Sequence, residues 1–295
     1  MPIKNSLASF MPVSLSISLT ELEKLRNVIL ETGLKRSNPK TEYELLRIED
    51  ADISIIVYKS GKVVHNDTEA SRRVIDKILE RERDYDLLLG SDEVGKGEWY
   101  GPLVVVCAAI TPPDILRLRK IGVKDSKLLG RTELERLASE IIGKGIIYRD
   151  VTLMPETYNK MYSEFQREKK SLNDMMAWSH AKAISSTLAY VSPGKTKIVI
   201  DKFDVKKTDL RLESAKVKSE NVEIIQSSKG DTELPVSVAS IVAKSLFEKK
   251  VNELNKIVGV DLRTVKPKDI DPEALPTVAK LHFSNVRSAL DSAKF

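Results

Sequence analysis

Two adjacent carboxylates and a lysine between glycines give one short stretch of this sequence the residue types of a metal and phosphate site. The stretch reads Gly90-Ser91-Asp92-Glu93-Val94-Gly95-Lys96-Gly97 and follows the apolar residues 87–89. Acids at a strand end require a cation or solvent, because an uncompensated charge is costly to bury, and glycines let the backbone approach a ligand closely. Lys96 adds a positive charge for a phosphate. A solvated hairpin turn explains the same residues equally well, so other parts of the chain must decide.

Three further charged clusters lie where expected elements end or begin. Asp201 ends the β-branched segment 197–201, and Asp231 and Glu233 lie in a loop before an amphipathic helix expected from about Pro235 to Ile257. Asp125-Ser126-Lys127 lies in a loop before a helix expected to begin at Thr132. Taken singly, each cluster has a structural explanation: a turn-forming Asp, an acid at a helix N-terminus, and a solvated turn.

Together, the acids indicate one shared site at a sheet edge. Asp92, Glu93, Asp201 and Asp231 can converge there, and four crowded carboxylates repel one another unless divalent cations lie between them. Oxygen ligands without His or Cys suit Mg²⁺ or Mn²⁺. Two such ions roughly 4 Å apart can hold the attacking water and the leaving oxygen of a phosphodiester.

The elements that must position these acids alternate between strands and helices. The N-terminal part predicts a strand at 13–19, a helix after Thr20, strands at 43–48, 53–57 and 63–64, and a helix around residues 74–79. The charged residues 80–84 predict an exposed linker between two domains. Beyond it, strands at 87–90, 103–110, 146–151, 197–201 and 222–226 interleave with helices at 132–142, 158–188 and 235–257. This order predicts an α/β fold, a mixed sheet covered by helices.

Composition narrows the class of protein. The chain has 295 residues, 41% of them hydrophobic, and a formal net charge of +5, which mildly favours a polyanionic partner. The single cysteine, Cys107, lies in an apolar run and predicts a small buried side chain in a reducing cytoplasm. The three histidines have no zinc-ligand spacing. No apolar run is long enough to cross a membrane, and the alternation at 13–19 argues against an export signal.

At this point the sequence resembles a known family, the type 2 ribonucleases H, and within it ribonuclease HIII more than ribonuclease HII. The resemblance spans essentially all of residues 87–295. It rests on motifs that occur in the family's order: Gly90-x-Asp92-Glu93-Val94-Gly95, Asp125-Ser126-Lys127, the strand-terminal Asp201, Lys229-Gly230-Asp231 and Ala239-Ser240-Ile241-x-Ala243-Lys244.

The subtype rests on segments outside the acidic motifs. Residues 97–102 and 279–283 are similar to ribonuclease HIII, and Lys96 stands where ribonuclease HII usually has Arg. An additional N-terminal domain, in which residues 53–64 are similar to half of a TATA-binding protein fold, points the same way.

The resemblance implies a fold, an activity and a site. It implies an RNase H-like mixed sheet flanked by helices at 86–295, with a small α+β substrate-binding domain at 1–85. It implies endonucleolytic cleavage of the RNA strand of an RNA/DNA hybrid with Mg²⁺ or Mn²⁺, leaving 3′-hydroxyl and 5′-phosphate ends. Independently of the resemblance, we expect a cytoplasmic protein without a membrane partner, and a monomer by default. The implied metal-binding and catalytic residues are Asp92, Glu93, Asp201 and Asp231; the implied substrate-binding residues are Gly95, Lys96, Gly97, Asp125, Ser126, Lys127, Ser240 and Lys244.

Some alternatives stay open. Ribonuclease HIII enzymes often carry Glu as the fourth acid, so Glu233 is the alternative to Asp231. A ribonuclease HII-type enzyme that incises single ribonucleotides in DNA, or a non-catalytic protein that binds hybrids, would share most of these features. Trp178 and His180 are interpreted as structural, because a lone helical histidine is more often a core or surface residue than a ligand. His282 stays ambiguous, because residues 280–283 mix a cation and an aromatic residue, and it is left out of the catalytic set.

Overall fold

The computed structural model describes residues 12–17, 19–123, 129–192, 194–228, 230 and 233–293. They form two compact units, each described here by itself. One unit contains the described residues before Tyr85 together with most of helix α3 (Pro112–Lys120). The other contains the remaining described residues from Tyr85 onward.

The N-terminal unit contains an antiparallel five-stranded sheet and, besides most of α3, the helices α1 (Leu19–Thr32) and α2 (Glu69–Arg83). Its strands β1 (Val13–Ser16), β2 (Arg36–Ser37), β3 (Glu44–Asp50), β4 (Ile53–Tyr58) and β5 (Lys62–His65) adopt the order β1-β5-β4-β3-β2. Helices α1 and α2 supply the remaining core side chains, among them Leu25, Ile29 and Val74, all buried. Alternate residues of the central strands, such as Ile55 and Val57, are fully buried, as a sheet with one covered face requires.

The second unit is built on a mixed sheet with the strand order β10-β9-β6-β7-β8. Its strands are β6 (Leu87–Val94), β7 (Leu103–Ile110), β8 (Ile147–Leu153), β9 (Thr196–Asp201) and β10 (Val222–Ser227). Strand β7 is antiparallel to both neighbours, whereas β6, β9 and β10 are parallel. All eight residues of β7 are buried, because helices cover both faces of the sheet.

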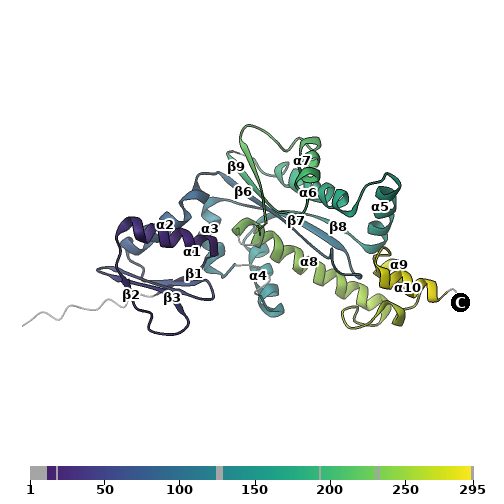
Figure 1. Cartoon of the computed structure of the whole chain (residues 1–295), viewed down its shortest axis with the longest axis horizontal. Coiled ribbons are helices and arrows are strands. Elements are labelled where there is room, and N and C mark those ends of the chain that lie inside the picture. Colours follow the sequence, from purple (N-terminus) through teal and green to yellow (C-terminus); the bar gives the residue numbers. More distant parts are fainter. Residues whose placement is uncertain are drawn as a thin grey trace, which may run out of the picture. The chain divides into compact units, whose positions relative to one another are not determined.

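The helices form two layers around this sheet (Figure 1). Helices α5 (Pro155–Arg167), α6 (Leu172–Leu188) and α7 (Val205–Ser214) lie on one side, and α4 (Arg131–Gly143) and the long α8 (Leu234–Val258) lie on the other. The chain ends with the short helices η3 (Pro267–Asp269), α9 (Leu275–Val278) and α10 (Ser284–Ser292). This mixed sheet flanked by helices, preceded by a small α+β unit, confirms the predicted fold class.

Several element boundaries differ from the sequence-based expectation. The charged residues expected to form a linker continue helix α2 to Arg83. The helical pattern expected over 158–188 is two helices, because a capping box of Ser171 and Asp174 begins α6 afresh. Strand β6 extends through Asp92 and Glu93 to Val94 rather than ending at Gly90, since β7 pairs with it along its whole length. No helix in the described ranges is both long and apolar enough for a membrane span.

Candidate active site

Asp92 and Glu93 leave strand β6 on opposite faces, because successive side chains of a strand alternate. Asp92 points to the side of helix α8, where the residue is only 8% exposed. Glu93 points to the side of helix α6, where His180 contacts its carboxylate. The two neighbouring acids therefore lie in different surroundings and have different partners.

Asp201 lies beside Asp92 at the end of the adjacent parallel strand. The last parallel pair between β6 and β9 joins Ser91 to Ile200, so Asp92 and Asp201 are the next residues of two strands about 4.8 Å apart. Burial and the nearby carboxylates of Glu93 and Asp201 raise the pKa of Asp92 to about 6. Hydrogen bonds from the Ser240 side chain and from the Glu93 backbone N–H act in the opposite direction but are outweighed. The raised pKa marks a place where negative charge gathers in a poorly solvated environment.

Helix α8 packs closely on strand β6 because the strand has a glycine, Gly90, where the helix lies against it. A Cβ atom at Gly90 would lie 2.0 Å from the carbonyl carbon of Pro235, so the first turn of α8 packs directly on the strand backbone. Ala239 and Ala243 continue this contact as fully buried small residues. The close approach allows the Ser240 hydroxyl to donate a hydrogen bond to the Asp92 carboxylate. Ser240, predicted to bind substrate, thus contacts an acid of the candidate site.

Glu93 is held by a buried histidine. His180 of α6 is fully buried, and its Nε2 lies 3.2 Å from Glu93 Oε2. Its Nδ1 lies 2.8 Å from the hydroxyl oxygen of Ser91. Burial would raise the pKa of Glu93, but the hydrogen bond from His180 and the nearby positive charge of Lys96 outweigh burial and lower it. The side chain of Glu93 is therefore fixed as a carboxylate.

The fourth acid lies at the edge of what the structure describes. Asp231 itself is outside the described residues, as are Asp125, Ser126 and Lys127. Gly230 packs against Asp201, since a Cβ there would lie 3.0 Å from the Asp201 Cα atom. Glu233, the alternative, is the N-cap residue of α8. Within the described ranges, no three His, Cys, Asp or Glu side chains come together as a ready metal cage.

The glycine-rich segment after β6 makes a tight turn. Gly95 has a φ of +90°, and a Cβ there would lie 2.1 Å from the carbonyl oxygen of Pro102, so only glycine fits. The ammonium group of Lys96 lies 5.6 Å from the ring centre of Phe203, two residues after Asp201. Gly97 has open space around it. Lys244, half-buried on α8, is the remaining described residue of the predicted substrate-binding set.

A buried lysine holds the far end of this turn. Lys280 is fully buried, and its Nζ donates hydrogen bonds of 2.9 Å to the carbonyl oxygens of Glu98 and Tyr100. Its backbone N–H donates to Trp99 O, so the segment after α9 pairs with residues 98–101. Burial lowers the pKa of Lys280 to about 7. Lys280 thereby fixes the segment that follows Gly95, Lys96 and Gly97.

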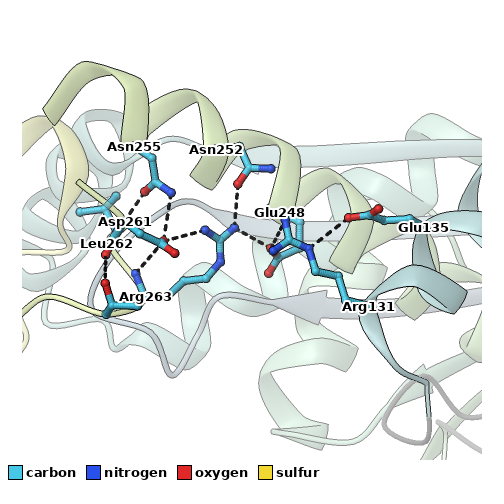
Figure 2. A network of polar contacts seen from close by, with 9 residues as sticks. Arg131, Glu135, Glu248, Asn252, Asn255, Asp261, Leu262 and Arg263 are labelled. Carbon is cyan, nitrogen blue, oxygen red and sulfur yellow. Dashed lines mark hydrogen bonds and ion pairs between the residues drawn. The ribbon is translucent and has the colours of Figure 1, made fainter. Parts of the chain in front are cut away.

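A polar network supports helices α4 and α8 on their outer side (Figure 2). Arg263 contacts Glu248 at 2.5 Å and Asp261 at 2.8 Å, and it donates to Asn252 of α8. Arg131, at the start of α4, lies 3.9 Å from the same Glu248 carboxylate. The network thus ties α8 to the beginning of α4, the helix that follows the predicted cationic loop.

Sequence reasoning missed the parts played by His180 and Lys280. His180 was placed among structural residues, yet it contacts Glu93. It lies between Met176 and Ile184 at helical spacing in the buried stripe of α6, and a histidine in such a stripe needs a polar partner. For Lys280, the lone cation among the apolar residues 278–281 was the available signal.

Comparisons with known proteins agree with this geometry. The family model described as Ribonuclease HII matches residues 89–286. A ribonuclease HIII of Bacillus cereus is 30% identical over 270 residues, which cover 80% of this chain and 85% of the relative. The structure of Bst-RNase HIII in complex with Mn²⁺ superposes with a TM-score of 0.63 at 24% identity, covering 96% of this chain and 99% of that one. The ribonuclease H2 of Pyrococcus horikoshii OT3 gives 0.56 at 26% identity, covering 70% and 99%.

The fold and these matches define a ribonuclease of the type 2 class. The chain belongs to the ribonuclease HII family, and its curated relatives over most of its length are ribonucleases HIII. The recognised resemblance is confirmed, and the chain is a ribonuclease H enzyme.

Proposed function

We propose that this enzyme hydrolyses the RNA strand of RNA/DNA hybrids at the edge formed by Asp92 and Asp201. The main support is that these two acids follow directly after the last residue pair of two parallel strands. In addition, burial and neighbouring carboxylates raise the pKa of Asp92. Water would add to phosphorus while the bond from phosphorus to the 3′ oxygen breaks and that oxygen gains a proton. The products would be a 3′-hydroxyl and a 5′-phosphate.

The residues present fit divalent cations. A buried carboxyl with acidic neighbours is stabilised in its charged form by a cation, and an all-oxygen donor set suits Mg²⁺ or Mn²⁺. Asp92, Glu93 and Asp201 would hold the ions, with Asp231 as the fourth acid or Glu233 in its place. The bound ions would neutralise phosphate charge and make water a better nucleophile.

The remaining predicted residues would bind the hybrid. The backbone around Gly95 and Gly97 would contact the 2′-hydroxyls that distinguish RNA from DNA, and Lys96, Lys127 and Lys244 would neutralise phosphates. Asp125, Ser126 and Ser240 complete this proposed set. Residues 1–85 would form a separate substrate-binding domain.

The test is cleavage of an end-labelled hybrid with Mg²⁺, Mn²⁺ or EDTA by the wild type, Asp92→Asn and Asp150→Asn. Asp150 is the matched control, because it lies in the same row of the sheet, paired through Val106 of β7, and is exposed. We expect EDTA and Asp92→Asn to abolish cleavage and Asp150→Asn to leave it unchanged. Full activity of Asp92→Asn would refute the proposal, and absence of cleavage by the wild type would favour a non-catalytic hybrid-binding protein.

The similarity to a ribonuclease H2 structure motivates a second candidate, incision at single ribonucleotides in DNA. A duplex with one embedded ribonucleotide distinguishes the two functions. Ribonuclease HIII activity predicts much slower cleavage of this duplex than of the all-RNA hybrid, and equal or faster cleavage would favour the second candidate.

The role of the N-terminal unit can be tested without removing it. Lys59 and Lys62 are exposed at the turn between β4 and β5. Reversing both charges with Lys59→Glu and Lys62→Glu should raise KM and leave kcat within about twofold, since phosphate contacts contribute binding rather than chemistry. An unchanged KM would count against this role.

A further inference from the structure

Three side chains form a buried hydrogen-bonded chain behind the candidate site: Ser91, His180 and Glu93. Ser91 and Glu93 lie two residues apart on the face of β6 that meets α6, and the His180 ring contacts both. Ser91 and His180 are fully buried, and the side chain of Glu93 is 15% exposed. The contact between Ser91 and His180 is therefore shielded from solvent, whereas the Glu93 carboxylate keeps some access to it.

The geometry assigns one orientation to the imidazole. Glu93 accepts hydrogen bonds only, so the nitrogen 3.2 Å from it, Nε2, must carry a proton. The other ring nitrogen, Nδ1, forms a hydrogen bond of 2.8 Å with the Ser91 hydroxyl, which can donate or accept. The ring of Phe203, just after Asp201, stacks on His180 with centroids 5.1 Å apart and limits its rotation.

We infer that His180 is a positioning residue for Glu93, holding Oε2 so that the remaining carboxylate oxygen stays available to a divalent cation. The inference rests on the proposed function, in which Glu93 is a metal-binding acid. Groups that orient a ligating carboxylate commonly contribute 10- to 100-fold in metal affinity or activity. Ser91 supports this positioning one step further back, because its hydroxyl contacts the second ring nitrogen of His180.

The direct test is Mn²⁺ binding to the full-length protein, measured from the electron paramagnetic resonance signal of free Mn²⁺. We expect His180→Ala to weaken binding by about 10-fold and Ser91→Ala to weaken it by a smaller factor. Ser179→Ala is the matched control. Ser179 is also buried, directly precedes His180 in α6, and donates a hydrogen bond to Met175 O within its own helix. Ser91→Ala removes one oxygen atom, so it keeps the test valid if His180→Ala does not fold.

A double-mutant cycle separates positioning from a general structural effect. In a Glu93→Gln background, His180→Ala should cause no further loss of Mn²⁺ affinity, because it acts only through the carboxylate. An equal loss in both backgrounds, or equal losses in Ser91→Ala and Ser179→Ala, would overturn the inference.

Asp92→Asn distinguishes failure of the inference from failure of the proposed site. If Asp92→Asn loses Mn²⁺ binding while His180→Ala retains it, the metal site stands and the positioning role is wrong. If neither variant changes Mn²⁺ binding, the site itself is wrong and the inference falls with it.

Discussion

Both units of the molecule bury an acid in a five-stranded sheet, but they compensate its charge differently. In the N-terminal sheet, Glu44 accepts two hydrogen bonds from Arg47 at 2.7 and 2.9 Å, and this bond with other contacts lowers its pKa to about 2. In the second sheet, burial and nearby carboxylates raise the pKa of Asp92 to about 6, although hydrogen bonds from the Ser240 hydroxyl and a backbone N–H favour its ionised form. The first acid has a cation supplied by the chain itself. Under the proposed function, the second takes a cation from solution.

The largest expected effect is on catalysis. Asp201→Asn should lower kcat/KM for an RNA/DNA hybrid by on the order of 10³-fold, because it removes a charge at the reaction centre. The Glu44→Gln variant, which removes the acid that already has its cation, should keep cleavage near the wild-type rate. Gel assays at matched protein concentration measure both, and similar losses would erase the contrast between the two acids.

The second-largest expected effect is a loss of stability when the partner of Glu44 in the N-terminal unit is removed. Arg47→Met leaves Glu44 among buried groups without its partner, and we expect a clear fall in the urea midpoint of unfolding. Arg73→Met is the control, since Arg73 pairs with Glu69 at the surface, where both side chains are more than 75% exposed. If the double variant Arg47→Met/Glu44→Leu regains the lost stability, the unpaired Glu44 charge is the cause. Equal urea midpoints for Arg47→Met and Arg73→Met would contradict this explanation.

A third prediction concerns stability against pH without metal. The pKa of Asp92 is higher in the folded protein, about 6 against an ordinary 3.8, so the contribution of this carboxyl to stability falls as pH rises from about 4 to 6. Asp92→Asn should therefore stabilise the metal-free protein above pH 6 by up to about 3 kcal/mol and have little effect near pH 4. Urea unfolding at pH 4 and pH 7.5 in EDTA measures this, and a gain independent of pH would exclude the charge as its cause.

The smallest expected effect comes from the hydroxyl beside Asp92. Ser240→Ala removes a hydrogen bond to the ionised carboxyl and should reduce metal-free stability at pH 7.5 by about 1–2 kcal/mol. In the Asp92→Asn background the same substitution should have a smaller effect, as calorimetry or urea unfolding can determine. Equal effects in the two backgrounds would mean that Ser240 acts elsewhere.

Local patterns predicted the fold class and most elements of the second unit. The apolar run Leu103–Ile110 is β7, and the β-branched residues before Asp201 form β9. Helix α3 was missed, because its two prolines and frequent charges resemble a loop. Strand β6 was predicted too short, because charged residues argue against a strand when its partner β7 is not known.

The site was predictable as a set of acids but not as an arrangement. The order of motifs identified Asp92, Glu93 and Asp201, and their metal-binding roles remain predictions. The contact between Glu93 and His180 joins residues 87 positions apart and depends on which face of α6 meets β6. The hydrogen bonds from Lys280 to the backbone of residues 98–100 were equally unpredictable, because a lysine is ordinarily expected at the surface. Such long-range partners arise only from tertiary packing.

The direct backbone contact between Gly90 and Pro235 limits which residues can occupy position 90. With no side chain between strand and helix, repacking cannot absorb an added methyl group, which would lie 2.0–2.2 Å from three backbone atoms. Any larger residue at position 90 would lift the whole helix from the sheet and carry the Ser240 hydroxyl out of reach of its acid. The spacing between α8 and the sheet edge that carries Asp92 thus depends on the absence of a side chain at Gly90, two residues before it.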